Sequence, residues 1–429
     1  MKIKVIITIA ISLVMPICLV PVFGQTVRTD SPLSWTDCVT LALSNNADLS
    51  SSRYALAASK SSYKGSYNAV LPQVALSNSY SSSDNPSSTG GANSGNWQAQ
   101  ASANLNIFNK AAYASIQGAK AQTTQQQANA RQVSSLLRFN LRKAFAQLLF
   151  AQKNIEVSKN IVAMRREEAQ MVILRYNSGR ESKGNMLRAN AQSLQAKADL
   201  AQSERDLRTA RAVLNRQLGL DDFTAIAVTG TLNTTQAPPD APKDERALMK
   251  DRPDVALQEA AVKSAETGLS QSESSFWPVL SANYSFSGSG PNEIPSLYSS
   301  WGVGLQYPLF GGGPTATYYA RSAAKNNLEK ARQDLRSVRE QAIVDIETSW
   351  STFAGAVDQL RVQSALLEAS RQRNDEANIR YDSGLLTYDN WEIIVSDRVN
   401  QERQAIQAQL NSVTAEAAWL KALGKPIEE

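Results

Sequence analysis

The sequence predicts an internally duplicated fold of the class α + membrane β, in which long coiled-coil helical hairpins are joined to membrane β-strands. Three observations in the 429-residue chain support this: an internal repeat, heptad-like apolar seams, and four segments of alternating polarity. Alternation with a period of two is typical of strands, whereas a period of 3.5 is typical of helices that pack on one another. We therefore expect four strands and two long hairpins per chain.

Residues 1–24 are expected to form a secretory signal peptide. Two lysines precede an apolar run that ends at Phe23, and Gly24 supplies a small residue before the expected cleavage site. An uncleaved membrane anchor is the alternative, because the run approaches the ~20 residues that span a bilayer. Cleavage would leave Cys38 as the one thiol, so no intrachain disulfide is expected.

An internal repeat organises the rest of the chain. The segment that begins at Arg175 recurs from Arg380, an offset of 205 residues, and Leu218-Gly219 recurs as Leu423-Gly424 at the same offset. Prolines between 237 and 242 favour an extended linker between the copies. The chain is therefore divided into a signal peptide at 1–24, repeat 1 at 25–219, a linker segment at 220–243 and repeat 2 at 244–429.

Each copy is predicted to contain a shorter helix, two strands, a long helix, a sharp turn and a second shorter helix. Apolar residues in the long helices are spaced alternately four and three apart, from Leu137 to Ile155 and again from Ile346 to Leu360, as in a coiled coil. A helix of about 65 residues is roughly 98 Å long, so it could lie beside two short helices stacked end to end. The expected helices are 36–69, 111–175 and 185–219, then 244–276, 315–380 and 388–423.

The four alternating segments are about ten residues long, which suits a tilted crossing of a bilayer. From Trp97 to Ile107 every odd position is apolar and every even position is polar. The polar faces carry uncharged Ser, Asn, Gln and Gly, as a water-filled lumen would require. A soluble sheet with one buried face is the alternative. The side chains expected on the lipid face include Trp97, Leu105, Tyr284, Phe286, Trp301 and Leu305.

Four strands cannot close a barrel, because the smallest membrane barrels have about eight. Open sheet edges are not tolerated in lipid. The chain is therefore expected to oligomerise, and three copies would supply 12 strands.

The composition excludes several classes of function. The chain has no histidine, and its 44 basic and 39 acidic residues are spread without a basic block, so no nucleic-acid partner is expected. Without histidine, and with one cysteine after cleavage, the usual zinc sites and His-based catalysis are removed. The segment Gly311-Gly312-Gly313-Pro314 lacks the Lys-Ser/Thr of a phosphate loop. No catalytic residue, cofactor or metal site is predicted.

Together, the ordered motifs resemble the TolC family of outer-membrane efflux and secretion channels. They comprise Asn45-Asn46-Ala47-Asp48-Leu49 and Asp251-Arg252-Pro253-Asp254-Val255 early in the copies, Leu71-Pro72 and Trp277-Pro278 before the strands, and Tyr307-Pro308-Leu309-Phe310 after the last strand. The two turns also match, as Tyr176-x-x-Gly179-x-x-Ser182-x-x-Asn185 and Tyr381-x-x-Gly384-x-x-Thr387-x-x-Asn390. Each motif is weak alone, but their order and duplication are specific.

The resemblance implies a homotrimer with a 12-stranded barrel in outer-membrane lipid, a periplasmic helical tunnel, and a small equatorial band built from about 220–243. It implies a passive exit duct for efflux or type I secretion, driven by an inner-membrane pump through a periplasmic adaptor protein. The alternative is a periplasmic coiled-coil adaptor or structural protein without a pore. The substrate and the identity of the pump are not predicted.

The two turns would then form the periplasmic tip, which closes the tunnel at rest and docks on the adaptor. Gly179 and Gly384 would be the tip glycines, which also suit a left-handed turn after a helix. Members of the family often carry Asp where Asn185 and Asn390 stand. Possible charges at the aperture are therefore Asp382, Asp389 and Glu392, unless these are simply solvated tip residues.

Overall fold

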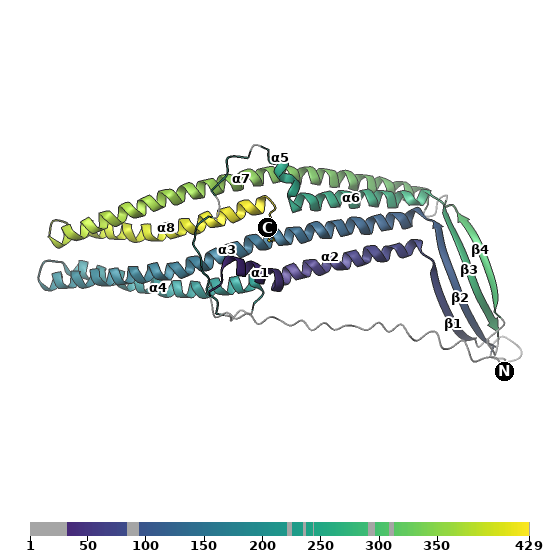
Figure 1. Ribbon diagram of the computed structural model, residues 1–429, viewed down its shortest axis with the longest axis horizontal. Helices are drawn as coiled ribbons and strands as arrows, with labels where there is room; N and C mark the ends of the chain where they lie inside the picture. The colour runs from purple at the N-terminus through teal and green to yellow at the C-terminus, as the bar shows by residue number, and fades with distance from the viewer. Residues whose placement is uncertain are drawn as a thin grey trace.

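The structure, a computed structural model, describes residues 32–83, 94–220, 225–234, 237–242, 244–290, 297–308 and 313–428. The predicted signal peptide lies outside these residues, as do parts of the linker and of the glycine-rich segment at 311–314. The molecule is elongated, with a four-stranded sheet at one end and two hairpin turns at the other (Figure 1). The predicted fold class is confirmed.

Both copies contain matching helices and strands in the same order, and copy 2 adds the short 3-10 helix η2. Copy 1 comprises α1 (Trp35–Asn45), α2 (Ala47–Ser66), η1 (Tyr67–Val70), β1 (Gln73–Ser83), β2 (Ser94–Phe108), α3 (Lys110–Asn177) and α4 (Lys183–Leu218). Copy 2 comprises α5 (Glu245–Leu248), η2 (Met249–Asp251), α6 (Pro253–Glu273), η3 (Ser274–Phe276), β3 (Val279–Gly290), β4 (Tyr298–Gln306), α7 (Pro314–Asp382) and α8 (Tyr388–Ala422).

The first helix predicted for each copy is interrupted in the structure. In copy 1 the backbone of Asn46 is extended, and its side chain caps α2 by accepting a hydrogen bond from the Leu49 N–H at 2.9 Å. In copy 2 the break falls before Pro253, which opens α6 because its missing N–H is not needed in a first turn. The continuous helices predicted at 36–69 and 244–276 were therefore wrong at these two points.

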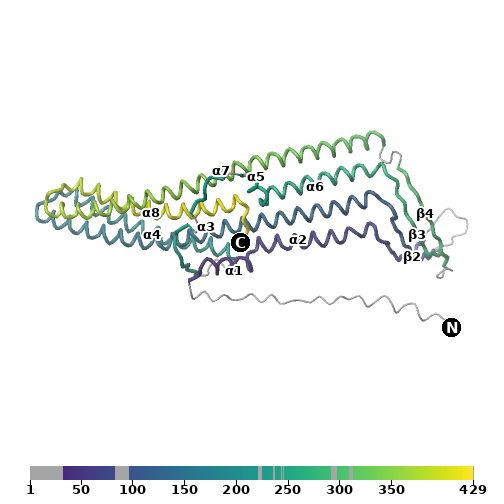
Figure 2. Tube along the Cα trace, turned by 45° about the horizontal axis from the view of Figure 1, so that its top comes forward, coloured from purple at the N-terminus to yellow at the C-terminus, as the bar shows by residue number. Residues whose placement is uncertain are grey.

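Each long helix lies beside two shorter helices stacked end to end, as the lengths predicted (Figure 2). In copy 1, α4 ends against the start of α2, where Asn46 Nδ2 donates to the Gln217 carbonyl at 2.9 Å. The approach is so close that a Cβ on Gly219 would lie 2.3 Å from the Asn45 carbonyl oxygen. In copy 2, Arg252 makes the joint between α8 and α6, since its Nη1 donates to the Ala422 carbonyl at 3.1 Å.

The helices form a curved layer. In the half nearer the sheet the neighbours run α2, α3, α6, α7, and in the half nearer the turns they run α4, α3, α8, α7 (Figure 1). Contacts of α3 with α6 and with α8 thus join the two copies, whereas α7 on one side and α2 with α4 on the other are the edges of the layer. Among the described residues, no helix is both long and apolar enough to cross a membrane.

The largest core cluster lies where the linker crosses the layer. Ile226, Val228 and Leu232 of the linker are buried in a cluster that includes Phe145 and Leu149 of α3. Backbone bonds between Leu33 and residues 227 and 229 fix this segment beside α1. The linker therefore adds a packed band at the middle of the helical layer.

The sheet is antiparallel in the order β1-β2-β3-β4, so β1 and β4 are its edges within the described residues. The register pairs Ala103 with Tyr284 and Tyr284 with Trp301, and it likewise pairs Leu280 with Leu305. Directly paired residues share a face. One face of the sheet therefore carries all six side chains predicted to meet lipid: Trp97, Leu105, Tyr284, Phe286, Trp301 and Leu305.

Candidate functional site

The two turns at the far end of the molecule, tip 1 (175–185) and tip 2 (380–390), share one backbone conformation. Gly179 and Gly384 have φ values of 70° and 77°. In each turn the glycine N–H donates to the carbonyl three residues earlier at 3.0 Å, and the next N–H donates to the carbonyl five residues earlier at 2.9 Å. This is the Schellman ending of a helix, which glycine adopts without the Cβ penalty.

The helices that follow the turns begin differently. Ser182 caps α4 by accepting a hydrogen bond from the Asn185 N–H at 3.1 Å, and Asn185 Nδ2 donates to Glu181 Oε1 at 2.7 Å. Thr387 occupies the equivalent position before α8 without a side-chain cap bond. Asn390 is exposed in the first turn of α8. Tip 1 is thus stiffened by more side-chain bonds than tip 2.

Arg175 and Tyr381 connect the two tips. Arg175 Nη2 donates to the Tyr381 carbonyl at 2.5 Å and to the Asp382 carbonyl at 3.1 Å. Its guanidinium also lies 4.1 Å from the centre of the Tyr381 ring, a favourable cation–π distance. The Tyr381 hydroxyl completes the connection by donating to Glu181 Oε2 at 3.0 Å.

The aromatic side chains behind this connection are buried. Tyr381 stacks on Trp391 with ring centres 4.5 Å apart, and Tyr388 lies beside both. Burial, with the hydrogen bond to Glu181 added, raises the pKa of Tyr381 well above its usual range. Burial raises the pKa of Tyr388 to about 12. Both phenols therefore stay neutral at physiological pH.

The three candidate aperture charges lie in different environments. The Asp382 side chain is 64% exposed, 4.0 Å from Arg175, and that of Asp389 is 75% exposed, 3.8 Å from Arg188. Glu392 is buried between helices, where it pairs with Arg165 at 3.1 Å. Tyr176 is half-buried at the end of α3. The role of these residues at an aperture stays a prediction.

Sequence reasoning did not single out Arg175, Glu181 or Trp391 as members of the site. Arg175 directly precedes the tip motif and Glu181 lies inside it, so the motif itself marked their neighbourhood. The contact between Arg175 and Tyr381 could not be predicted from the sequence, because more than 200 residues of chain separate them. A search for charged residues in and next to the tip motifs would have found Arg175 and Glu181.

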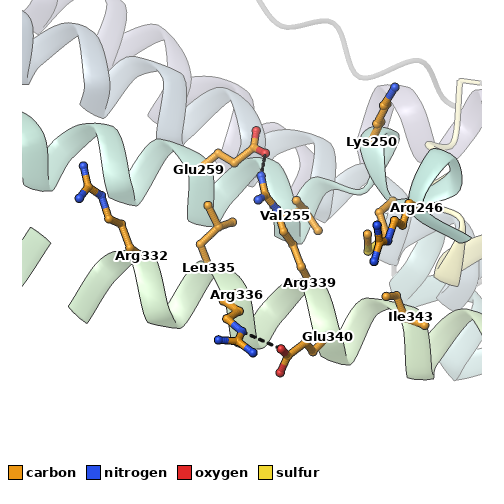
Figure 3. Close-up of a pocket in the computed structure, with 11 residues that line it drawn as sticks. Arg246, Lys250, Val255, Glu259, Arg332, Leu335, Arg336, Arg339, Glu340 and Ile343 are labelled. Carbon is orange, nitrogen blue, oxygen red and sulfur yellow. Dashed lines mark hydrogen bonds and ion pairs between the residues drawn. The ribbon is translucent and has the colours of Figure 1, made fainter. Parts of the chain in front are cut away.

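One hollow lies at the tips and another lies away from them, beside α5. One, of about 430 Å³, lies between the tips and is lined by residues of both. The other, of about 630 Å³, lies between α6 and α7 under α5 and has several cations at its rim (Figure 3). Its arginines are largely satisfied within the chain, since Arg339 pairs with Glu259 at 2.7 Å and Arg336 with Glu340 at 2.9 Å. No group of three acidic, His or Cys side chains suited to a metal occurs among the described residues.

Comparison with known sequences assigns the family. The family described as outer membrane efflux protein matches residues 38–220 and 246–425, one range in each copy. The chain belongs to the outer membrane efflux protein family. Membership of this family places the protein in the outer membrane, with its long helices forming a large periplasmic part.

One known relative is similar to part of the sequence, and solved structures share the fold. The chain is 28% identical over 186 residues to the pyoverdine export outer membrane protein OpmQ of Pseudomonas aeruginosa, a match that spans 41% of this chain and 38% of that relative. The outer-membrane channel OprN superposes with a TM-score of 0.80 at 19% identity, over 92% of this chain and 90% of OprN. The CmeC outer membrane channel of Campylobacter jejuni gives 0.81 at 15% identity, over 91% and 85% of the two chains.

Proposed function

We propose that the chain is one subunit of a homotrimeric outer-membrane channel, a passive exit duct in an efflux or secretion system. The unpaired edge strands of the sheet are the main support for this proposal. In the described sheet β1 and β4 each have a neighbour on one side only, and unpaired strand edges are unfavourable in lipid. Three subunits would pair these edges and close 12 strands into a barrel.

The helical layer has matching open edges. Exposed apolar residues lie on α4, at Leu187 and Leu194, and on α7, at Val362 and Leu366. Inside one subunit the long helix α3 of copy 1 packs on the short helix α8 of copy 2. The equivalent contact between subunits is α7 of one subunit against α4 of the next, which would close the layer into a tunnel. Repeats 1 and 2 would then be equivalent sectors of its wall.

The tips are proposed to close the tunnel and to dock on a periplasmic adaptor that links the channel to an inner-membrane pump. Arg175 and Tyr381 hold the two tips of a subunit together. By the 205-residue offset, Arg380 would face Tyr176 of the next subunit. Replacement of Gly384 by Trp is expected to abolish docking on the adaptor while trimers still assemble. Normal export by that variant would contradict the docking role of tip 2.

The runner-up is a periplasmic adaptor or structural protein whose sheet packs in water. The apolar face of the sheet argues against it, because Trp301 is 80% exposed and Leu305 is 70% exposed. An exposed apolar patch of this kind needs lipid or a partner to cover it.

Cell fractionation and mass measurement test the proposal. The full-length protein would be extracted from outer membranes in a mild detergent, its mass determined, and its conductance recorded in planar lipid bilayers. A heat-labile trimer that conducts ions is the expected result. A monomer in the soluble fraction that forms no pore would overturn the proposal and favour the adaptor.

A further inference from the structure

A buried ionic cluster lies in the seam between hairpin 1 (α3–α4) and hairpin 2 (α7–α8), just above the tips. Arg165 Nη1 of α3 lies 3.1 Å from Glu168 Oε2 of the same helix and 3.1 Å from Glu392 Oε2 of α8. The three side chains are 8%, 12% and 4% exposed. One buried cation therefore faces two buried carboxylates, and one of those contacts crosses the seam.

The two carboxylates are not equivalent. Glu392 accepts further hydrogen bonds from Gln192 Nε2 and from the Ser396 hydroxyl, both at 2.5 Å. Within the described part of the chain, Glu168 is hydrogen-bonded by Arg165 alone. Burial raises the pKa of Glu168 to about 7, against the opposing charge of Arg165 and with help from the charge of Glu392. Glu168 is thus the member that takes up a proton near neutral pH.

The other charged groups around the cluster are accounted for. On α4, Arg188 pairs with Asp389 at 3.8 Å. On α8, Arg398 pairs with Asp375 of α7 at 3.6 Å, and its charge lowers the pKa of Glu168 against the larger effect of burial. The Tyr388 hydroxyl is buried with no hydrogen-bond partner among the described residues, and its raised pKa of about 12 keeps it neutral. Glu168 is therefore the group here that changes charge between mildly acidic and neutral pH.

We propose that Arg165, Glu168 and Glu392 form a pH-sensitive latch that holds the two hairpins of a subunit together. When Glu168 is ionised, it competes with Glu392 for Arg165 and repels Glu392 across the seam. When Glu168 is protonated, Arg165 and Glu392 form a balanced pair between α3 and α8. Acidification therefore tightens the seam and a rise in pH loosens it. The inference rests on the proposed function, because separation of the hairpins is what would open a tunnel closed at the tips.

The sign follows from proton linkage. In separated hairpins Glu168 would be solvated and would titrate at its ordinary pKa of 4.5, whereas in the closed seam its pKa is about 7. The closed state then binds more protons between these values, so its advantage is complete below 4.5 and is lost as the pH rises through about 7. At one decade per pKa unit, the closing equilibrium changes by at most a few hundred-fold per subunit.

The latch is confined to one of the two kinds of seam. At the 205-residue offset, Arg165 and Glu168 correspond to Ser370 and Arg373 on α7, and Glu392 corresponds to Leu187 on α4. In the proposed trimer these residues would line the seam between subunits, which lacks both carboxylates. Only the seam inside each subunit would respond to this titration.

Conductance as a function of pH tests the latch. Full-length trimers in planar bilayers would be compared between pH 5 and pH 8 for the wild type, Glu168→Gln, and the control Glu167→Gln, which alters an exposed neighbour. The wild type and Glu167→Gln are expected to conduct more as the pH rises through about 7, whereas Glu168→Gln stays low throughout. Wild-type pH dependence in Glu168→Gln would overturn the latch.

A second readout separates the latch from the channel. Spin labels at Ser178→Cys and Leu385→Cys, both exposed, report the distance between the tips of one subunit when labelled chains are diluted with unlabelled ones. The distance should lengthen above pH 7 in the wild type and not in Glu168→Gln. A protein that never conducts but shows this change would contradict the proposed channel and keep the latch; equal distances at all pH values would overturn the latch.

Discussion

In copy 1 the joint between the stacked short helices is made by Asn46, whereas in copy 2 it is made by Arg252. The Asn46 amide caps α2 and donates to the Gln217 carbonyl at the end of α4. Arg252 is buried, donates to the Ala342 and Ala422 carbonyls, and pairs with two aspartates at 2.6 and 3.0 Å. In each copy the side chain satisfies one carbonyl in the last turn of the helix nearer the tips, where that carbonyl has no partner within its own helix.

The copies also differ at their seams. The seam between α3 and α8 holds the buried pair Arg165–Glu392, but the equivalent residues on the outer edges are Ser370 and Leu187. A buried charge is tolerated where its partner is always present on the same chain. The same helical arrangement can therefore have ionic contacts inside a subunit and neutral or apolar residues at the edges where another subunit would pack.

The largest effects are expected in the core, at equivalent positions of the two long helices. Phe353 is 1% exposed and Leu148 is 0% exposed. Phe353→Ala should cost about 3–5 kcal/mol and Leu148→Ala about 2–5 kcal/mol, because each leaves a cavity. Thermal unfolding followed by circular dichroism in detergent measures both. A loss below about 1 kcal/mol in only one variant would show that the copies are not packed equivalently.

The next effect concerns the apolar face of the sheet, which both copies share. Leu105→Arg in β2 and Leu305→Arg in β4 should each disfavour insertion by about 2–4 kcal/mol if this face meets lipid. The yield of protein in the outer membrane is the measurement. Ser300→Arg is the matched control, because Ser300 pairs with Ser285 on the opposite, polar face. Equal yields from all three variants would contradict the assignment of the apolar face to lipid.

Much of this architecture was predictable from sequence because it is periodic. The spacing of Leu141 and Leu148 predicted the packed face of α3, and alternation from Trp97 to Ile107 predicted β2; both residues of the first pair are fully buried. A period fixes which side of an element is covered, since side chains recur on one face. The offset between copies extended each assignment to its partner.

The breaks and cross-contacts were less predictable. The interruption at Asn46 depends on the end of α4, which lies some 170 residues away in the chain. The latch of Arg165 with Glu392, 227 residues apart, depends on how the two hairpins pack. The sequence therefore suggested Glu392 as a possible aperture charge because it lies near the turn, whereas the structure buries its side chain in the seam. Such contacts are set by tertiary packing and leave no local pattern.

An effect of similar size at one site, and a smaller one at the other, are expected from alanine at two glycines of similar φ in copy 1. Gly219→Ala must displace the Asn45 carbonyl, so about 2–5 kcal/mol is expected from overlap and left-handed strain together. Gly179→Ala meets no atom within 4 Å, so only the strain of about 1–2 kcal/mol applies. Thermal unfolding of both variants isolates the cost of the joint. Equal losses would show that the joint yields freely.

The smallest effects should separate the two joints themselves. Asn46→Ala removes a cap and one hydrogen bond, at about 1 kcal/mol. Arg252→Met removes the donor to the Ala422 carbonyl and the ionic partner of two partly exposed aspartates, at about 2 kcal/mol. Burial raises the pKa of Asp254, but the bonds and charge of Arg252 outweigh burial and hold that pKa below its ordinary 3.8. The wild type therefore loses this advantage as the pH falls below 3.8. Denaturation between pH 3 and pH 7 should show the deficit of Arg252→Met narrowing in acid while that of Asn46→Ala stays constant, because only the joint of copy 2 is ionic.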